Sequence, residues 1–88
     1  MITPEQFTAA KARLSSAHAA YAAADDLCKQ DFTDSRQDAR DAATDEINEA
    51  ENALENLYLA HRSGLSLEAV EALSGEDHRS LRLKHNFR

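Results

Sequence analysis

The chain lacks several features on which nucleotide-binding enzymes, secreted proteins and membrane proteins depend. It has one cysteine, Cys28, so no intramolecular disulfide can form. Its only glycines are Gly64 and Gly75, which excludes a glycine-rich nucleotide-binding loop. No run of about 18 apolar residues occurs, and no basic start precedes an apolar stretch. We therefore expect neither a membrane span nor a signal peptide, and we expect a cytoplasmic protein.

Large apolar side chains are also scarce. Leu, Ile, Val and Phe supply sixteen of the 88 residues, whereas alanine alone supplies seventeen. With a net charge of −6, this composition lies close to that of disordered chains. We reject disorder because the apolar residues recur at helical spacing and alanine is the strongest helix former. A core this thin favours association with another protein or with a second copy as a homodimer.

Helical periodicity is present in two long stretches, residues 4–29 and 35–63. In the first, side chains at alternating steps of three and four are Phe7, Ala10, Leu14, Ala17, Tyr21, Ala24 and Cys28. In the second, the same spacing links Ala43, Ile47, Ala50, Leu54, Leu57 and His61. Each set forms one stripe along a helix, and the alanines allow two helices to approach closely. We interpret Cys28 as a small buried hydrophobe of this stripe rather than a reactive thiol.

The connection between these stretches is short. It contains residues that cap helices, and Asp34 or Ser35 is the expected cap of the second helix. Phe32 is expected to plug the end of the resulting hairpin. Two helices joined by so short a connection pack as antiparallel neighbours. The alternative is one continuous helix through this region, which would form a long coiled-coil dimer.

The last third of the chain contains shorter elements. Gly64 ends the second helix, and Ser66 caps a short third helix over residues 67–74. Residues 76–88 form a basic segment that is either extended or a short amphipathic helix starting at Asp77. The sequence thus predicts a single all-α domain over residues 1–88. Its architecture is an antiparallel, coiled-coil-like two-helix hairpin with a short third helix packed across it and a basic C-terminal segment.

Charge is distributed unevenly along the chain. Residues 25–55 carry eleven acids and three bases, whereas residues 78–88 carry four bases and no acid. Within the second helix one row of carboxylates lies about 150° around the axis from the apolar stripe. This predicted acidic face consists of Asp38, Asp41, Asp45 and Glu49. An acidic face disfavours nucleic acid and anionic membranes, and it favours a protein partner with a basic surface.

No constellation for catalysis or for metal binding occurs. The four histidines, His18, His61, His78 and His85, include no pair spaced by one helical turn, and there is no second cysteine. Carboxylates are abundant, but they lie on helix faces without a cleft to give an acid and a base different environments. We therefore expect no enzyme activity, no cofactor and no metal site.

Three functions remain. The first is a non-enzymatic interaction protein whose acidic face binds, and by occupying a nucleic-acid-binding channel inhibits, a basic partner. Some phage-encoded anti-defence proteins, including anti-CRISPRs, act in this manner, although no motif links this chain to them. The second is a small dimeric nucleic-acid-binding regulator, whose contact would be Arg79, Arg82, Lys84 and Arg88. The segment from Gly64 onward resembles a helix-turn-helix unit only weakly, because Glu71 stands where a small residue is usual. The third is a structural subunit of a helical assembly.

Overall fold

The computed structural model describes residues 2–85, and helices account for 86% of them. The predicted all-α class is confirmed, and no strand occurs within this range. Four helices follow one another along the chain: α1 (Pro4–Gln30), α2 (Asp34–Ser63), α3 (Leu67–Glu71) and α4 (Gly75–Lys84). Arg88, one of the predicted nucleic-acid contacts, lies outside the described residues.

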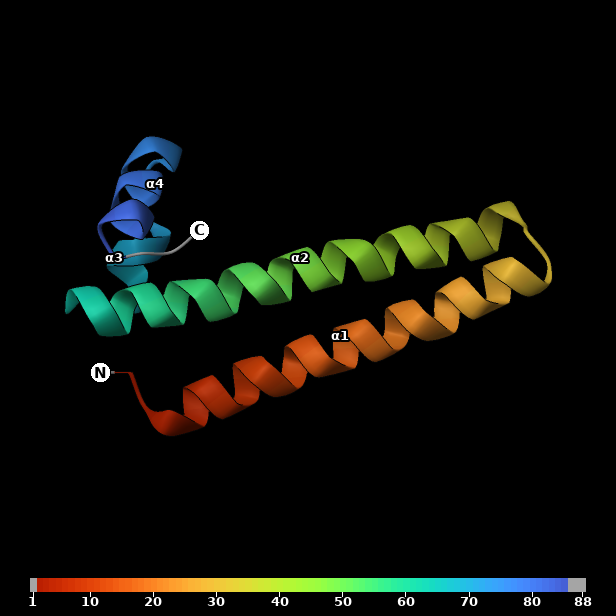
Figure 1. The fold of residues 1–88 in the computed structure, drawn as a ribbon, viewed down its shortest axis with the longest axis horizontal. Helices are drawn as coiled ribbons and strands as arrows, with labels where there is room; N and C mark the ends of the chain where they lie inside the picture. The colour runs from red at the N-terminus through yellow and green to blue at the C-terminus, as the bar shows by residue number, and fades with distance from the viewer. Residues whose placement is uncertain (1, 86–88) are drawn as a thin grey trace.

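The two long helices form the predicted antiparallel hairpin, so the continuous-helix alternative is wrong (Figure 1). Helix α1 begins with a reciprocal cap, in which Thr3 N–H donates to Gln6 Oε1 at 2.8 Å and Gln6 N–H donates to Thr3 Oγ1 at 3.3 Å. Helix α2 ends at Gly64, whose φ of 76° supplies the left-handed cap. The glycine cap confirms the end predicted for the second helix.

Small side chains predominate in the most buried part of the contact between α1 and α2. Ala17 and Cys28 of α1 are buried, as are Ala43, Ala50 and Leu57 of α2. The two stripes therefore pack as predicted and the thiol is buried, except that His61, the last residue of the second stripe, is exposed. Larger residues of the stripes, such as Leu54 and Tyr21, are half-buried. The open end of the hairpin is filled by aromatic rings, because the centroid of Phe7 lies 4.8 Å from that of Tyr58 and 6.0 Å from that of His61.

The turn between α1 and α2 differs from the prediction in two respects. Thr33, not Asp34 or Ser35, caps α2, and its hydroxyl accepts from Arg36 N–H at 3.2 Å. Phe32 does not plug the hairpin, because 59% of it is exposed. The guanidinium of Arg36 closes the turn instead, donating to the backbone oxygens of Leu27 at 3.0 Å and Asp31 at 2.9 Å. A side chain from the start of α2, and not the ring, therefore holds the turn together.

The C-terminal third is more helical than predicted. Helix α3 ends at Glu71 rather than at residue 74, because Ser74 serves as the cap of α4 and accepts from Asp77 N–H at 3.2 Å. Gly75 is consequently the first residue of α4 and does not close α3. Of the two conformations considered for the basic segment, the helix is correct, although it starts two residues earlier than Asp77.

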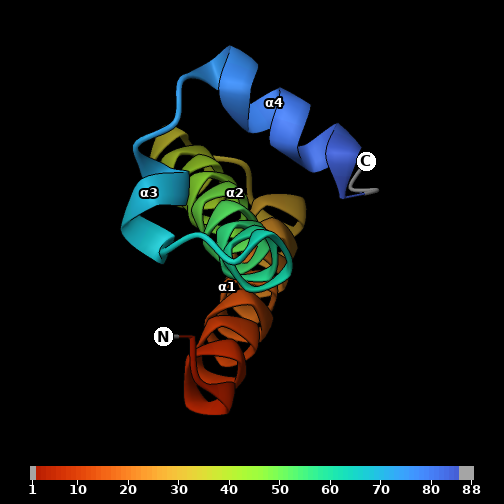
Figure 2. The ribbon, with the colours of Figure 1, turned by 90° about the vertical axis from the view of Figure 1, so that its left-hand side faces the viewer.

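Helices α3 and α4 pack on α2, on the side away from α1 (Figures 1 and 2). A second apolar cluster holds them there: Leu59 and Val70 have no exposed surface, Ala60 is buried, and Ile2 and Leu81 pack against them. The third helix therefore does not cross both long helices as predicted. The reason is Leu59, which lies about 160° around α2 from the stripe that contacts α1. At this end α2 has two apolar faces.

Candidate functional site

The side of α2 that faces away from α1, called here the outer face, has two halves. Its C-terminal half lies under α3 and α4, and its N-terminal half carries no other element of the described chain (Figure 1). The predicted acidic face lies in the middle and N-terminal part of this surface. Its four residues, Asp38, Asp41, Asp45 and Glu49, are all exposed. The structure thus places these carboxylates together on one uncovered helix surface.

One member of the acidic face also contacts α1. Arg13 Nη2 lies 3.4 Å from Glu49 Oε2, and Arg13 Nε donates to Glu46 Oε1 at 2.6 Å. This hydrogen bond lowers the pKa of Glu46 and raises that of Arg13, since each charge favours the ionised form of the other. Asp38, Asp41 and Asp45 form no ion pair among residues 2–85. These three aspartates are the part of the face that is available to a partner.

The cations nearest to the acidic face already have partners. Lys29 Nζ lies 3.1 Å from Asp25 Oδ2, and Arg40 Nη1 lies 3.4 Å from Asp25 Oδ1. The hydrogen bond from Lys29, assisted by Arg40, holds the pKa of Asp25 below its usual value, and the same bond raises the pKa of Lys29. The remaining base of this region is Arg36, which donates to the turn carbonyls. None of the three bases therefore pairs with Asp38, Asp41 or Asp45.

Of the basic residues predicted as a nucleic-acid contact, the three within the described range, Arg79, Arg82 and Lys84, are not presented as one surface. Arg82 turns toward α2 and pairs with Glu55, and both side chains are mostly covered. Arg79 and Lys84 are exposed, but Glu76 and Asp77 are exposed on the same helix. The C-terminal basic segment is therefore partly used to fasten α4 to the hairpin.

Two residues that the sequence did not single out complete this attachment. Glu55 supplies the carboxylate for Arg82, and Asn56 Oδ1 lies 2.7 Å from His78 Nε2. The backbone oxygen of His85 accepts from Arg62 Nη1 at 3.2 Å, which secures the end of α4. The spacing of the sequence did contain a signal for Asn56, because on a helical wheel this residue continues the angular row of Asp38 and Asp45. The sequence alone did not show that α4 would cover this row at Asn56.

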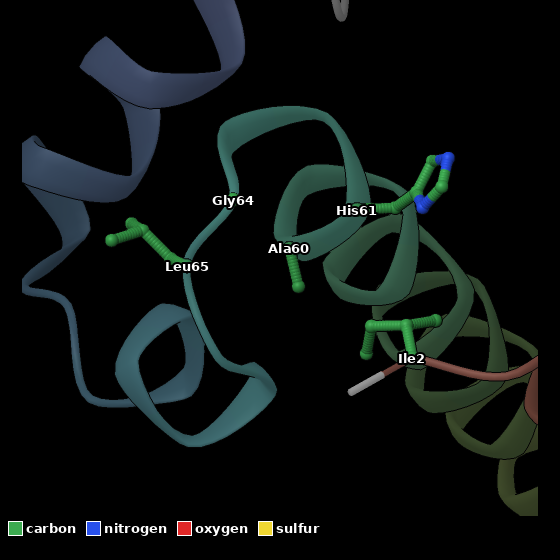
Figure 3. A pocket seen from close by; sticks show the side chains of 5 residues that line it. All are labelled: Ile2, Ala60, His61, Gly64 and Leu65. Atoms are coloured by element: carbon green, nitrogen blue, oxygen red, sulfur yellow. The ribbon is translucent and has the colours of Figure 1, made fainter.

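A shallow hollow lies where the N-terminal residues meet the end of α2. It is lined by Ile2, Ala60, His61, Gly64 and Leu65 (Figure 3). The ring of His61 points away from Gly64 and Leu65, and it is the only titratable side chain in this lining. The hollow thus offers no pair of groups for acid–base chemistry. Elsewhere in residues 2–85, no group of three or more His, Cys, Asp or Glu side chains is arranged to hold a metal ion.

Two further findings bear on the class of protein. None of the helices in the described range is long and apolar enough to cross a membrane. The chain matches no protein family, and no curated protein or solved structure is significantly similar to it. Fold and surface chemistry therefore define it as an all-α helical hairpin that carries two short helices, and inference about function depends on its surface.

Proposed function

We propose that this protein is a non-enzymatic interaction protein whose acidic face binds a basic surface of a protein partner. The observation that carries the proposal is the charge arrangement around Asp38, Asp41 and Asp45. Their carboxylates are exposed and form no ion pair within the described chain, while the bases nearest to them are committed elsewhere. Such a surface attracts cationic partners over a distance, and the attraction chiefly speeds association.

Where the partner's basic surface binds nucleic acid, the bound protein would inhibit it by competition for the same cations. This is the manner of action of some small phage anti-defence proteins, and the likeness is one of mechanism class only. The rigid hairpin suits this role because the carboxylates lie on a helix already fixed by α1. Little ordering of backbone is then needed on binding, which lowers the entropic cost of association.

The nucleic-acid-binding alternative has less support from the surface. It requires the basic C-terminal residues to act together, but Arg82 is paired with Glu55 and acids flank the exposed Arg79 on α4. Phosphate binding by so few free cations would be weak at physiological salt. A role as a structural subunit of a larger assembly stays a prediction.

A pair of matched variants tests the proposal. One reverses Asp38, Asp41 and Asp45 to lysine, and the other reverses the exposed Arg79 and Lys84 to glutamate and leaves Arg82 in its ion pair. Fluorescence anisotropy would measure the affinity of each for a labelled Lys/Ala helical peptide and for a DNA duplex. We expect wild type to bind the peptide in a salt-sensitive manner and the aspartate variant to lose this binding.

The same pair of variants identifies the partner. In affinity capture from host lysate, wild type and the Arg79/Lys84 variant should retain a basic protein that the aspartate variant does not. Purified, that protein should lose nucleic-acid binding when wild type is added. A different result would favour the nucleic-acid-binding alternative over this proposal. In that result wild type binds the DNA duplex, the Arg79/Lys84 variant loses duplex binding, and the aspartate variant keeps it.

A further inference from the structure

The turn end of the hairpin, residues 26–34, is called here the hairpin tip. It lies at the opposite end of the molecule from α3 and α4 (Figure 1). Two large apolar side chains are exposed there, Leu27 at 45% and Phe32 at 59%. Nothing in the described chain covers them. Phe32 would be expected to bury itself in the turn, and its exposure has no explanation in the packing of the hairpin.

The tip is a fixed structure, so this exposure does not come from a loose turn. Arg36 holds two of its backbone oxygens, those of Leu27 and Asp31, and Asp31 N–H donates to Leu27 O at 3.1 Å. The Thr33 cap fixes the following residues at the start of α2. An aromatic ring between two such fixed points is presented at little entropic cost, which is the property of an interface anchor.

Acids surround these two apolar side chains. Asp26, Asp31 and Asp34 are exposed and form no ion pair among residues 2–85. The single base of the tip, Lys29, is paired with Asp25. The chemistry complementary to an apolar centre with carboxylates on both flanks is an apolar stripe with cations on both flanks. A basic amphipathic helix has that arrangement.

We propose that the hairpin tip binds a basic amphipathic helical segment of the partner, with Phe32 as the anchor and Leu27 beside it. This inference rests on the proposed function and extends it. The aspartates of the tip and of the acidic face attract the partner's cations, while the ring and the leucine fix its position. Charge supplies the rate of association, and the apolar contact supplies the lifetime of the complex.

Two synthetic helical peptides of equal length and equal lysine content provide the test. One carries leucine along its apolar stripe, and the other carries alanine there. Wild type should bind the Lys/Leu peptide about tenfold or more tightly than the Lys/Ala peptide, as expected for an aromatic anchor. The double variant Leu27→Ala and Phe32→Ala should bind both peptides equally, at the Lys/Ala level. Circular dichroism should show that its helix content is unchanged, because both side chains are exposed.

Leu83→Ala is the matched control, since Leu83 is 65% exposed on α4 and lies outside the tip. It should keep the wild-type preference for the Lys/Leu peptide. Equal affinity of wild type for both peptides, or an unchanged preference in the Leu27/Phe32 variant, would overturn the inference. So would sedimentation showing that Phe32 instead joins two copies of the chain. If the Asp38/Asp41/Asp45 variant loses peptide binding and the Leu27/Phe32 variant does not, the proposed function is retained and the role of the tip is rejected. If the Asp38/Asp41/Asp45 variant binds the peptides normally, the proposed function itself is rejected.

Discussion

The two halves of the outer face of α2 belong to one helix and point in one direction, but they differ in chemistry. In the C-terminal half, the fully buried Leu59 and the charged Glu55 fasten α3 and α4. In the N-terminal half, Asp38, Asp41 and Asp45 stand in the corresponding positions, and no element of residues 2–85 covers them. In the covered half, the apolar cluster around Leu59 and the ion pair of Glu55 together hold two short helices. Carboxylates alone leave the surface free for another molecule.

The largest effect is expected at the centre of the covered half. Leu59→Ala should destabilise the protein by about 2–5 kcal/mol, because the side chain is fully buried against Val70 and its loss leaves a cavity. A small domain has little reserve, so thermal melts followed by circular dichroism should show a large fall in Tm. Leu54→Ala, at a half-buried position, should cost less. Equal costs at the two positions would mean that the second apolar cluster is not a distinct core.

The ion pair that fastens α4 should have a smaller effect. Glu55→Gln removes the carboxylate that pairs with Arg82, and the loss of this mostly covered ion pair should cost about 1–2 kcal/mol. The loss should appear first as faster amide hydrogen exchange in α4, since α1 and most of α2 do not depend on this contact. Uniformly faster exchange throughout the hairpin would show that the two halves of α2 are not independent.

The contact between Arg13 and Glu46 should have the smallest effect, and it should depend on pH. The pKa of Glu46 is lowered in the folded protein, so the pair stabilises fully above the unfolded glutamate pKa of about 4.3 and stops doing so as pH falls through the lower folded value. Wild type should therefore melt slightly above Glu46→Gln at pH 7, and the difference should vanish in strong acid. The effect is small because each side chain remains close to half exposed, where water weakens the ion pair. A difference that grows on acidification would contradict this assignment.

The sequence predicted the hairpin because its determinants are local and periodic. Thr3 and Gly64 mark helix ends by chemistry that involves only neighbouring residues, and the stripes follow a single period. The second cluster was missed because Leu59 has no periodic companions on its face; its partners Val70 and Leu81 come from other helices. A periodic pattern detects one packing face per helix, and α2 has two.

The candidate site divides in the same way. The exposure of Asp38, Asp41 and Asp45 followed from their angle to the apolar stripe, which is a property of one helix. The partners of Arg82 and Glu49 depend on how helices meet, namely α4 with α2 and α1 with α2. Spacing within one segment contains no information about such contacts. The exposure of Phe32 was missed because nothing in the sequence showed that Arg36 would close the turn.

The central claim is that the uncovered half of α2 is the binding half. Titration of the ¹⁵N-labelled protein with the Lys/Ala peptide, followed by NMR, tests this claim most directly, because each backbone amide reports separately. Chemical-shift changes should concentrate on residues 34–49, diminish as salt is added, and be lost when Asp38, Asp41 and Asp45 are reversed to lysine, with helix content preserved. Changes centred on α4 instead, or equal changes in the charge-reversed variant, would contradict the account.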